Sequence, residues 1–318
     1  MFRSCFLALV VLPAAIATAQ FHEPLITTRP GETVVQRWQV GVKVSLPAGG
    51  MKNLVATMPV PADWPEQKVR VLGEDLSPGA KVSYQTIDDG AKQMTITFPK
   101  IGAGEELRGL VTFEITRKLQ EKPADTSQFQ LPDVKKSDRK LSAYLAPSPY
   151  IESTHGEIRA LARQVGADEK KAWARVEAIY RWVRGRVQYK EEPLKGALAA
   201  LHDGTGDCDE LSSLFIAICR AAGIPARTVR LPTHCYAEFY LVDEKGVGQW
   251  FPCQPAGTEA FGEMPDPRPI LQKGDNILCQ APLGKKKERC RFLPQNFTAV
   301  PLAKGEQPKV EFICQLLP

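Results

Sequence analysis

The stretch that decides the fold is "GTGDCDELSSLFIAICRAAGIPAR", residues 204–227. Asp207 is followed three residues later by Glu210, a capping-box pattern that predicts a helix beginning at Cys208. Apolar residues then recur at helical spacing on one face: Leu211, Leu214, Phe215, Ile218, Cys219 and Ala222. Gly223 predicts the end of the helix. The sequence therefore places Cys208 at the inward edge of a buried helix, at its positive end.

The acidic neighbours of Cys208 raise the question of its reactivity, because nearby carboxylates raise the pKa of a thiol. We expect Asp207 and Glu210 to bind backbone N–H groups as caps and to point away from the sulfur. Free N–H groups and the helix dipole then favour a thiolate at Cys208. The same N–H groups could stabilise an oxyanion, so the pattern favours a nucleophile that still needs a base.

A base is predicted in "LPTHCYAEFYLVDEKGVGQWFPCQPAG", residues 231–257, where two strand-like runs flank a turn. If His234 faces Gln254, partner numbers sum to 488 and the loop is 243–245, a common hairpin length. The amide oxygen of Gln254 would then orient the imidazole. On its own, His234 reads more simply as a half-buried histidine bonded to the backbone. The helix-start cysteine makes the base the preferred interpretation.

The same register predicts a disulfide between Cys235 and Cys253, whose numbers also sum to 488. Directly opposed residues of antiparallel strands lie close enough for a disulfide, and this pair would lie on the sheet face opposite His234. The alternative is a pair of small buried hydrophobic residues. Cys219 is expected to stay a free core thiol, while pairing among three tail cysteines stays open: Cys279, Cys290 and Cys314.

A resemblance adds to this interpretation. The segments "GALAALHDGTGDCDELSSLFIAICRAAGIPAR", "THCYAEFYL" and "GQWFPCQPAG" resemble the transglutaminase-like superfamily of papain-related cysteine enzymes, and its secreted bacterial members in particular. The resemblance covers about residues 150–275. It implies that Cys208 is the nucleophile, His234 the catalytic histidine, and Gln254 the third member. The family usually has an aspartate at that third position, so the triad here lacks its negative charge.

The fold class predicted for the whole chain is α+β. Strands with period-two alternation before residue 120 indicate an N-terminal antiparallel β-sandwich. The resemblance implies a papain-like core behind it, a nucleophile helix packed on an antiparallel sheet. The expected segments are a signal peptide (1–19), a β-sandwich domain (20–120), a linker (121–150), a transglutaminase-like catalytic domain (151–275) and a C-terminal extension (276–318).

Two further helices are expected before the cysteine helix. Thr154 and Glu157 form a capping-box pattern that opens a helix to about Gln164. Asp168 is a candidate cap for the next helix, whose apolar positions recur at helical spacing: Trp173, Val176, Ile179, Tyr180, Val183 and Val187. Trp182 and Tyr189 are expected in the core, and Glu238 lies too far along its strand to replace the base.

Composition limits the partners. A basic Arg3, a short apolar run and the sequence Ala17-Thr18-Ala19 predict a signal peptide cleaved near Ala19, and hence a secreted or periplasmic protein. The formal charge of +5 is too small to indicate nucleic acid binding. No later run is long enough to span a membrane. Without a CxxC pair, and with scattered histidines, the sequence suggests no metal and no cofactor.

The function predicted is a secreted cysteine amide hydrolase or acyltransferase, of protease or amidase type, that acts on a protein or peptide through a thioester. The alternative is a catalytically silent transglutaminase-like binding module of the cell surface. A structural surface protein held by disulfides is a weaker third hypothesis, because it leaves the pattern at Cys208 and His234 unexplained.

Overall fold

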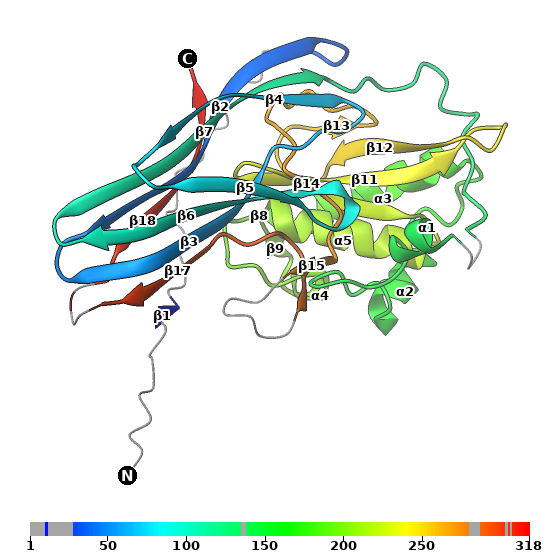
Figure 1. Cartoon of the computed structure of the whole chain (residues 1–318). Coiled ribbons are helices and arrows are strands. Elements are labelled where there is room, and N and C mark those ends of the chain that lie inside the picture. Colours follow the sequence, from blue (N-terminus) through cyan, green and yellow to red (C-terminus); the bar gives the residue numbers. More distant parts are fainter. Residues whose placement is uncertain (1–9, 12–27, 135–137, 280–286, 303–304, 306) are drawn as a thin grey trace.

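A computed structural model describes residues 10–11, 28–134, 138–279, 287–302, 305 and 307–318. Two antiparallel sheets form one half of the molecule, and a third sheet with a layer of helices forms the other (Figure 1). The protein is thus α+β, as the sequence predicts. Apart from Val10 and Val11, the expected signal peptide lies outside the described residues. In the described part, no helix combines the length and apolar character needed to cross a bilayer.

The N-terminal half places two sheets around one hydrophobic core. The first has the order β1-β17-β3-β6-β5, with bounds Val10–Val11, Asn296–Pro301, Gly50–Val60, Lys92–Gly102 and Lys81–Thr86. The second has the order β18-β2-β7-β4, with bounds Lys309–Leu317, Thr33–Leu46, Glu105–Lys118 and Gln67–Leu76. The period-two alternation expected before residue 120 is present along β2, where five alternate residues are buried: Trp38, Val40, Val42, Val44 and Leu46.

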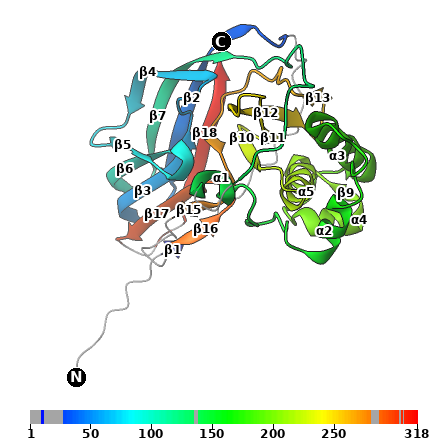
Figure 2. The ribbon, with the colours of Figure 1, turned by 90° about the vertical axis from the view of Figure 1, so that its right-hand side faces the viewer.

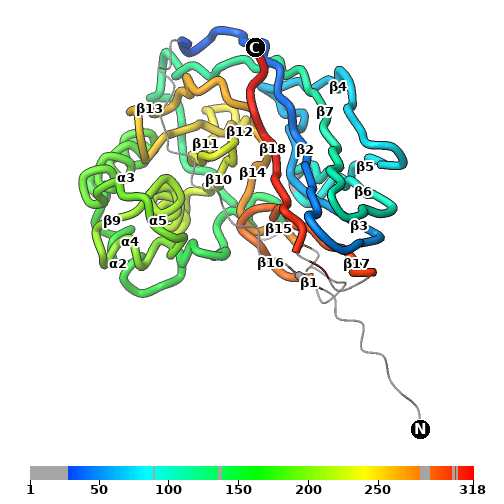
Figure 3. The backbone as a smooth tube through the Cα atoms, turned by 90° about the vertical axis from the view of Figure 1, so that its left-hand side faces the viewer, coloured from blue at the N-terminus to red at the C-terminus, as the bar shows by residue number. Residues whose placement is uncertain are grey.

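The C-terminal segment returns to the N-terminal sheets. β17 pairs with β3, and β18 pairs along β2 from Lys309↔Ser45 to Leu317↔Arg37. Figure 3 shows β18 lying beside β2. The short β15 (Ile277–Cys279) and β16 (Glu288–Cys290) precede β17 and β18 in the chain and pair with each other. The segment expected only as an extension therefore supplies a strand to each N-terminal sheet.

The other half is built on a five-stranded sheet of order β13-β12-β11-β10-β14. Its strands are Ala260–Phe261, Gly248–Gln254, His234–Val242, Ala226–Leu231 and Gln272–Lys273. One face packs against α5 (Cys208–Ala221), and the other packs against the N-terminal half, with Trp64 among its neighbours. Figure 2 shows this sheet between the helices and the N-terminal strands. Burial on both faces makes the sheet a rigid support for its side chains.

Four further elements contact α5: α2 (Gly156–Ala162), α3 (Ala172–Arg186), α4 (Ala197–Asp203) and β9 (Thr205–Gly206). The other short elements are α1 (Arg139–Ala143), β8 (Gln188–Tyr189), which pairs with β9, and the 3₁₀ turn η1 (Asp88–Gly90), which contacts β14 and β15. The predicted capping box of α5 is present, with Asp207 as cap and Cys208 as first residue. Gly223, at φ +81°, follows the end of the helix as expected.

Two helix starts differ from the sequence prediction. The cap of α2 is His155, not Thr154, and its ring accepts the N–H of Glu157. α3 begins at Ala172 behind Lys171, which makes no side-chain cap, so Asp168 lies outside the helix. The predicted apolar face of α3 is nevertheless buried. The apolar periodicity therefore located both helices correctly. The predicted caps, Thr154 and Asp168, lie near the helix starts but do not cap them.

The predicted hairpin register is wrong by two residues. β11 and β12 pair Val242 with Gly248 and Ala237 with Cys253, so partner numbers sum to 490. The loop is 243–247, because Asp243 accepts the N–H groups of Lys245 and Val247 at 2.9 and 2.8 Å. Gly246 takes the left-handed conformation, with φ +77°, inside this loop.

The register change removes the predicted disulfide. Cys253 faces Ala237 instead of Cys235, and both cysteines are free thiols. The prediction that both lie on one sheet face was right, because both join the core that α5 covers. Cys219 is a free core thiol, as expected. A register shift of two residues changes the cross-strand partner of each residue. It leaves each side chain on the same face of the sheet, because side chains alternate with a period of two.

Candidate active site

Cys208 begins α5 at the edge of a cleft of about 1140 Å³. The side chain of Asp207 accepts the N–H of Asp209 at 2.7 Å, and Glu210 reaches back to the N–H of Asp207. Within the described residues, the N–H of Cys208 itself donates to no acceptor. The thiol is 9% exposed and lies at the positive end of the helix dipole. The cap therefore leaves one N–H next to the sulfur for a ligand.

His234 is the first residue of β11 and lines the same cleft. Its Nε2 lies 3.2 Å from Oε1 of Gln254, the partner predicted from the sequence. The amide nitrogen of Gln254 donates to the carbonyl of Thr258 at 2.9 Å, which leaves the amide oxygen facing the ring. Because an amide oxygen only accepts, His234 carries its proton on Nε2 when neutral, and Nδ1 is free to act as a base.

The Cys208 thiol has a pKa well below its ordinary value. The largest cause is a hydrogen bond from Cys235, while burial opposes the shift. A hydrogen bond and the charge of His234 lower the pKa further. The structure thus brings together the three residues predicted from the sequence, in an arrangement that favours a thiolate beside an oriented imidazole.

Asp207 behaves differently from an ordinary carboxyl group. Burial raises its pKa to about 8, with a further contribution from the negative charge of Cys208. Around neutral pH, Asp207 therefore holds a proton and adds no full negative charge beside the thiolate. One of the two flanking charges is thereby removed, while Asp209 still raises the pKa of Cys208.

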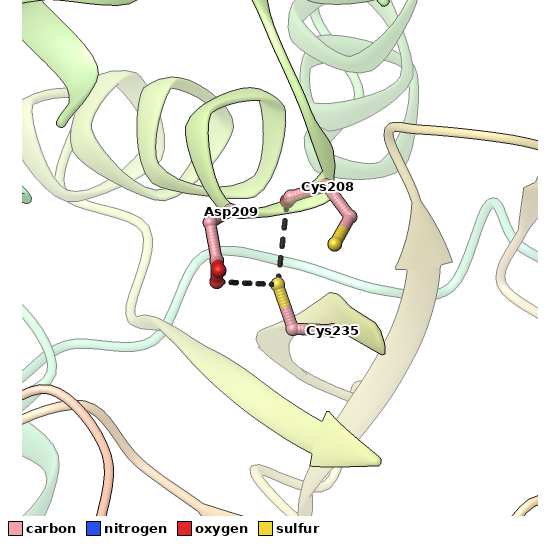
Figure 4. A group of neighbouring side chains, drawn as sticks. All are labelled: Cys208, Asp209 and Cys235. Atoms are coloured by element: carbon pink, nitrogen blue, oxygen red, sulfur yellow. Dashed lines mark hydrogen bonds between the residues drawn. The ribbon is translucent and has the colours of Figure 1, made fainter. Parts of the chain in front are cut away.

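Beside Cys208 lies a group of side chains that sequence reasoning missed (Figure 4). Cys235 Sγ is 3.1 Å from Asp209 Oδ1 and 3.3 Å from the backbone oxygen of Cys208. The two sulfurs and an Asp209 oxygen all lie within 4.8 Å of one another. The one sequence feature that could have indicated this contact is the alternation along β11, because it turns the side chain of Cys235 toward α5.

Two arginines hold Asp209 in its ionised form. Burial would raise the pKa of Asp209, but Arg291 and Arg230, each 3.5 Å from a carboxylate oxygen, bring it below the ordinary value. Arg291 comes from the C-terminal segment and also donates to the carbonyl of Asp209 at 3.0 Å. Although two thiols and a carboxylate are a plausible donor set for a soft cation, two guanidinium groups beside it oppose cation binding.

The walls of the cleft come from segments on both sides of Cys208. Tyr189 and Leu194 form one wall, and Tyr189 is 50% exposed, so its predicted place in the core is wrong. Arg184 secures the opposite wall by donating to the carbonyls of Gln254, Pro255 and Gly257 at 3.0–3.2 Å. The loop that carries Gln254 is thereby fixed from behind.

The other aromatic and acidic candidates lie elsewhere. Trp182 packs against the helical core, as expected. Glu238 is fully buried and forms ion pairs with Lys273 and Arg227 at 2.6 and 2.7 Å, so it is not available as a base.

Comparison with known proteins gives a consistent result. A model of the family described as "Transglutaminase-like superfamily" matches residues 159–255. A solved structure from Cytophaga hutchinsonii, described as a "Putative Cysteine Protease", is similar over 90% of this chain and 93% of that one, with a TM-score of 0.55 and 16% identity. Another structure, from Parabacteroides distasonis and described as a "putative protease", is aligned over 72% of this chain and 48% of that one, with a TM-score of 0.30 and 15% identity. No curated protein matches the chain.

The first of these structures shares the fold across both halves of the molecule, and at 16% identity the likeness concerns the fold alone. The family match includes Cys208, His234 and Gln254 within its bounds. Residues 159–255 therefore resemble the transglutaminase-like superfamily, and the family match is confined to this part of the chain.

Proposed function

We propose that this protein is a cysteine-nucleophile amide hydrolase or acyltransferase, with Cys208, His234 and Gln254 as its catalytic residues. The observation that carries the proposal is the lowered pKa of Cys208 beside a histidine whose far nitrogen is held by Gln254. A thiolate paired with an imidazole is the usual means by which enzymes activate cysteine for attack on a carbonyl.

The chemistry follows from the positions of these groups. Cys208 Sγ attacks a carboxamide carbon, and the free N–H of Cys208 donates to the oxyanion that forms. His234 transfers a proton from Nδ1 to the leaving amine, which departs and leaves a thioester on Cys208. His234 then removes a proton from water or from an acceptor amine, whose attack on the thioester restores the thiolate.

The uncharged Gln254 changes the balance of this mechanism. An amide oxygen orients the ring through one hydrogen bond, but it cannot stabilise the imidazolium as a carboxylate would. The thiolate supplies the compensating charge before attack. We therefore expect turnover that is slower than an aspartate at position 254 would support.

A protein or peptide is the proposed substrate, and the cleft of about 1140 Å³ can hold an extended segment of one. The leader-like residues 1–19 favour action outside the cytoplasm, in the periplasm or beyond the cell. We further propose that the two N-terminal sheets form a β-sandwich that serves as a scaffold or recognition module.

Incubation with a mixed peptide substrate, with and without a primary amine, tests this function. New peptide termini would indicate hydrolysis, while incorporation of the amine would indicate acyl transfer. Both should disappear in Cys208→Ala and His234→Ala. The uncharged Gln254 favours one other function, a binding module without turnover. That function gains support if wild type forms no thioester and Cys208 reacts with iodoacetamide no faster than the buried Cys219.

A further inference from the structure

The two sulfurs beside α5 are the starting point. Cys208 Sγ and Cys235 Sγ face each other within 4.8 Å and come from different elements, the start of α5 and the start of β11 (Figure 4). A disulfide needs its sulfurs at about 2.05 Å, so the two side chains must move closer together before they can bond. The geometry thus allows a bond between the proposed nucleophile and its neighbour.

The two thiols differ in access. Cys208 lines the cleft, so a small oxidant can reach it from solvent. Cys235 is 1% exposed and does not line the cleft. Burial raises the pKa of Cys235 well above its ordinary value, and the neighbouring Cys208 raises it further. Oxidation should therefore begin at Cys208, with Cys235 reacting second.

The surroundings of Cys235 are unlike those of a buried apolar thiol. Its sulfur faces Asp209 Oδ1, the carbonyl of Cys208 and, at 3.8 Å, the hydroxyl of Ser212. The buried thiol therefore has hydrogen-bond acceptors for its proton. A cysteine that only filled space in the core would not need them. A cation shared by the same atoms is the competing explanation, and the guanidinium groups of Arg230 and Arg291 oppose it.

We propose that Cys235 is a resolving cysteine that closes a disulfide with Cys208 when the nucleophile is oxidised. A peroxide oxidises the Cys208 thiolate to a sulfenic acid and is itself reduced to hydroxide or alkoxide. Cys235 sulfur then attacks the Cys208 sulfur, the S–O bond breaks, and the departing hydroxyl takes the Cys235 proton to leave as water. A thiol reductant returns both cysteines to their reduced forms. Formation of the disulfide does not depend on the proposed function. Its consequence, the reversible protection of the nucleophile, rests on that function.

Mass mapping after peroxide tests the proposal without any need for a substrate. Reduced protein is treated with hydrogen peroxide, alkylated and digested with trypsin without reduction. We expect peptide 196–220 joined to peptide 231–245, two hydrogens lighter than their sum, and separated by dithiothreitol. Because Cys219 shares the first peptide, the experiment is done in a Cys219→Ala background, where only Cys208 can form the link.

Two variants sharpen the result. In Cys235→Ser the link should be absent, and Cys208 should proceed to sulfinic and sulfonic acids that dithiothreitol does not reverse. Cys253→Ser is the matched control, a buried cysteine on the same sheet face, and should leave the link intact.

The outcomes separate this inference from the proposed function. If wild-type Cys208 oxidises while Cys235 is recovered fully alkylated, the resolving role is wrong and the nucleophile stands. If, in the wild-type protein, Cys208 neither oxidises nor alkylates faster than Cys219, both are wrong.

Discussion

At the residue scale, the amide of Gln254 is held at both ends. Its nitrogen is bound by the carbonyl of Thr258 and its oxygen meets the ring of His234. The residue can therefore orient the imidazole without a charge. We expect Gln254 to contribute by orienting His234, and this role requires a hydrogen-bond acceptor at position 254.

Replacing Gln254 by alanine should slow alkylation of Cys208 at neutral pH by about tenfold to a hundredfold. A hydrogen bond to a charged partner contributes roughly 1.5–3 kcal/mol, and each 1.4 kcal/mol corresponds to about a factor of ten. Gln254→Asp should match or exceed wild type, because its charge favours the imidazolium and hence the thiolate. The alkylation rate is followed by intact mass. Equal rates in wild type and Gln254→Ala would show that Gln254 does not orient the base.

Asp207 should make folding stability depend on pH. Its pKa is raised from 3.8 to about 8, so the folded protein holds the proton more tightly than the unfolded chain does. That contribution to stability is complete below about pH 4 and is lost as the pH rises to about 8. Asp207→Asn, which keeps the cap but cannot ionise, should therefore gain stability relative to wild type across this window. Urea unfolding measured at several pH values tests this, and a constant difference between the two proteins would contradict it.

At the element scale, helices and strands followed from the sequence more readily than their pairing. The Asp207–Glu210 pattern located the start of α5 to the residue, and the apolar spacing located its buried face. The hairpin register did not follow, because two loop lengths suit the same strands and only the bonds made by Asp243 select the longer one. Since both registers put His234 and Gln254 on one face, the contact between these two residues was predicted correctly from an incorrect register. The disulfide prediction needed the exact register and was wrong.

The last turn of α5 is fixed by a buried ion pair. Arg220 binds both carboxylate oxygens of Asp275 at 2.8 and 2.9 Å, and also the carbonyl of Ala226. Arg220→Ala leaves the Asp275 carboxylate buried without its partner, so we expect a loss of about 3–5 kcal/mol in unfolding free energy. Arg181→Ala, which removes an exposed pair with Glu177 on α3, should cost less than about 0.5 kcal/mol. Urea denaturation compares the two, and similar losses would refute the role assigned to Arg220.

At the scale of the whole molecule, the sheet β13-β12-β11-β10-β14 is joined to the N-terminal half by buried polar groups. Lys273 forms ion pairs with Glu238 of the sheet and with Glu66 of the N-terminal half. Arg117 of β7 donates to the carbonyl of Arg268. These contacts join residues far apart in the chain, so no local sequence pattern could predict them, and the same is true of the return of β17 and β18.

The two halves should therefore unfold together. Gln67 donates to the carbonyls of Ala62 and Ile270 at 2.7 and 2.9 Å and accepts the N–H of Ile270 at 2.7 Å. Gln67→Ala should cost about 1–3 kcal/mol by leaving buried backbone groups of Ile270 unpaired. Hydrogen exchange should show equal loss of protection in β7 and β11. Loss confined to β7 and its neighbours would show that the halves fold independently.

The account as a whole depends on a thiolate at Cys208 that is supported by His234. The most direct measurement is the ultraviolet absorbance of the thiolate as a function of pH, taken as the difference between wild type and Cys208→Ser. We predict a transition at a pH well below the ordinary cysteine pKa of about 8.5, and a shift to higher pH in His234→Ala. A wild-type transition at or above about 8.5, unchanged by His234→Ala, would contradict the central claim.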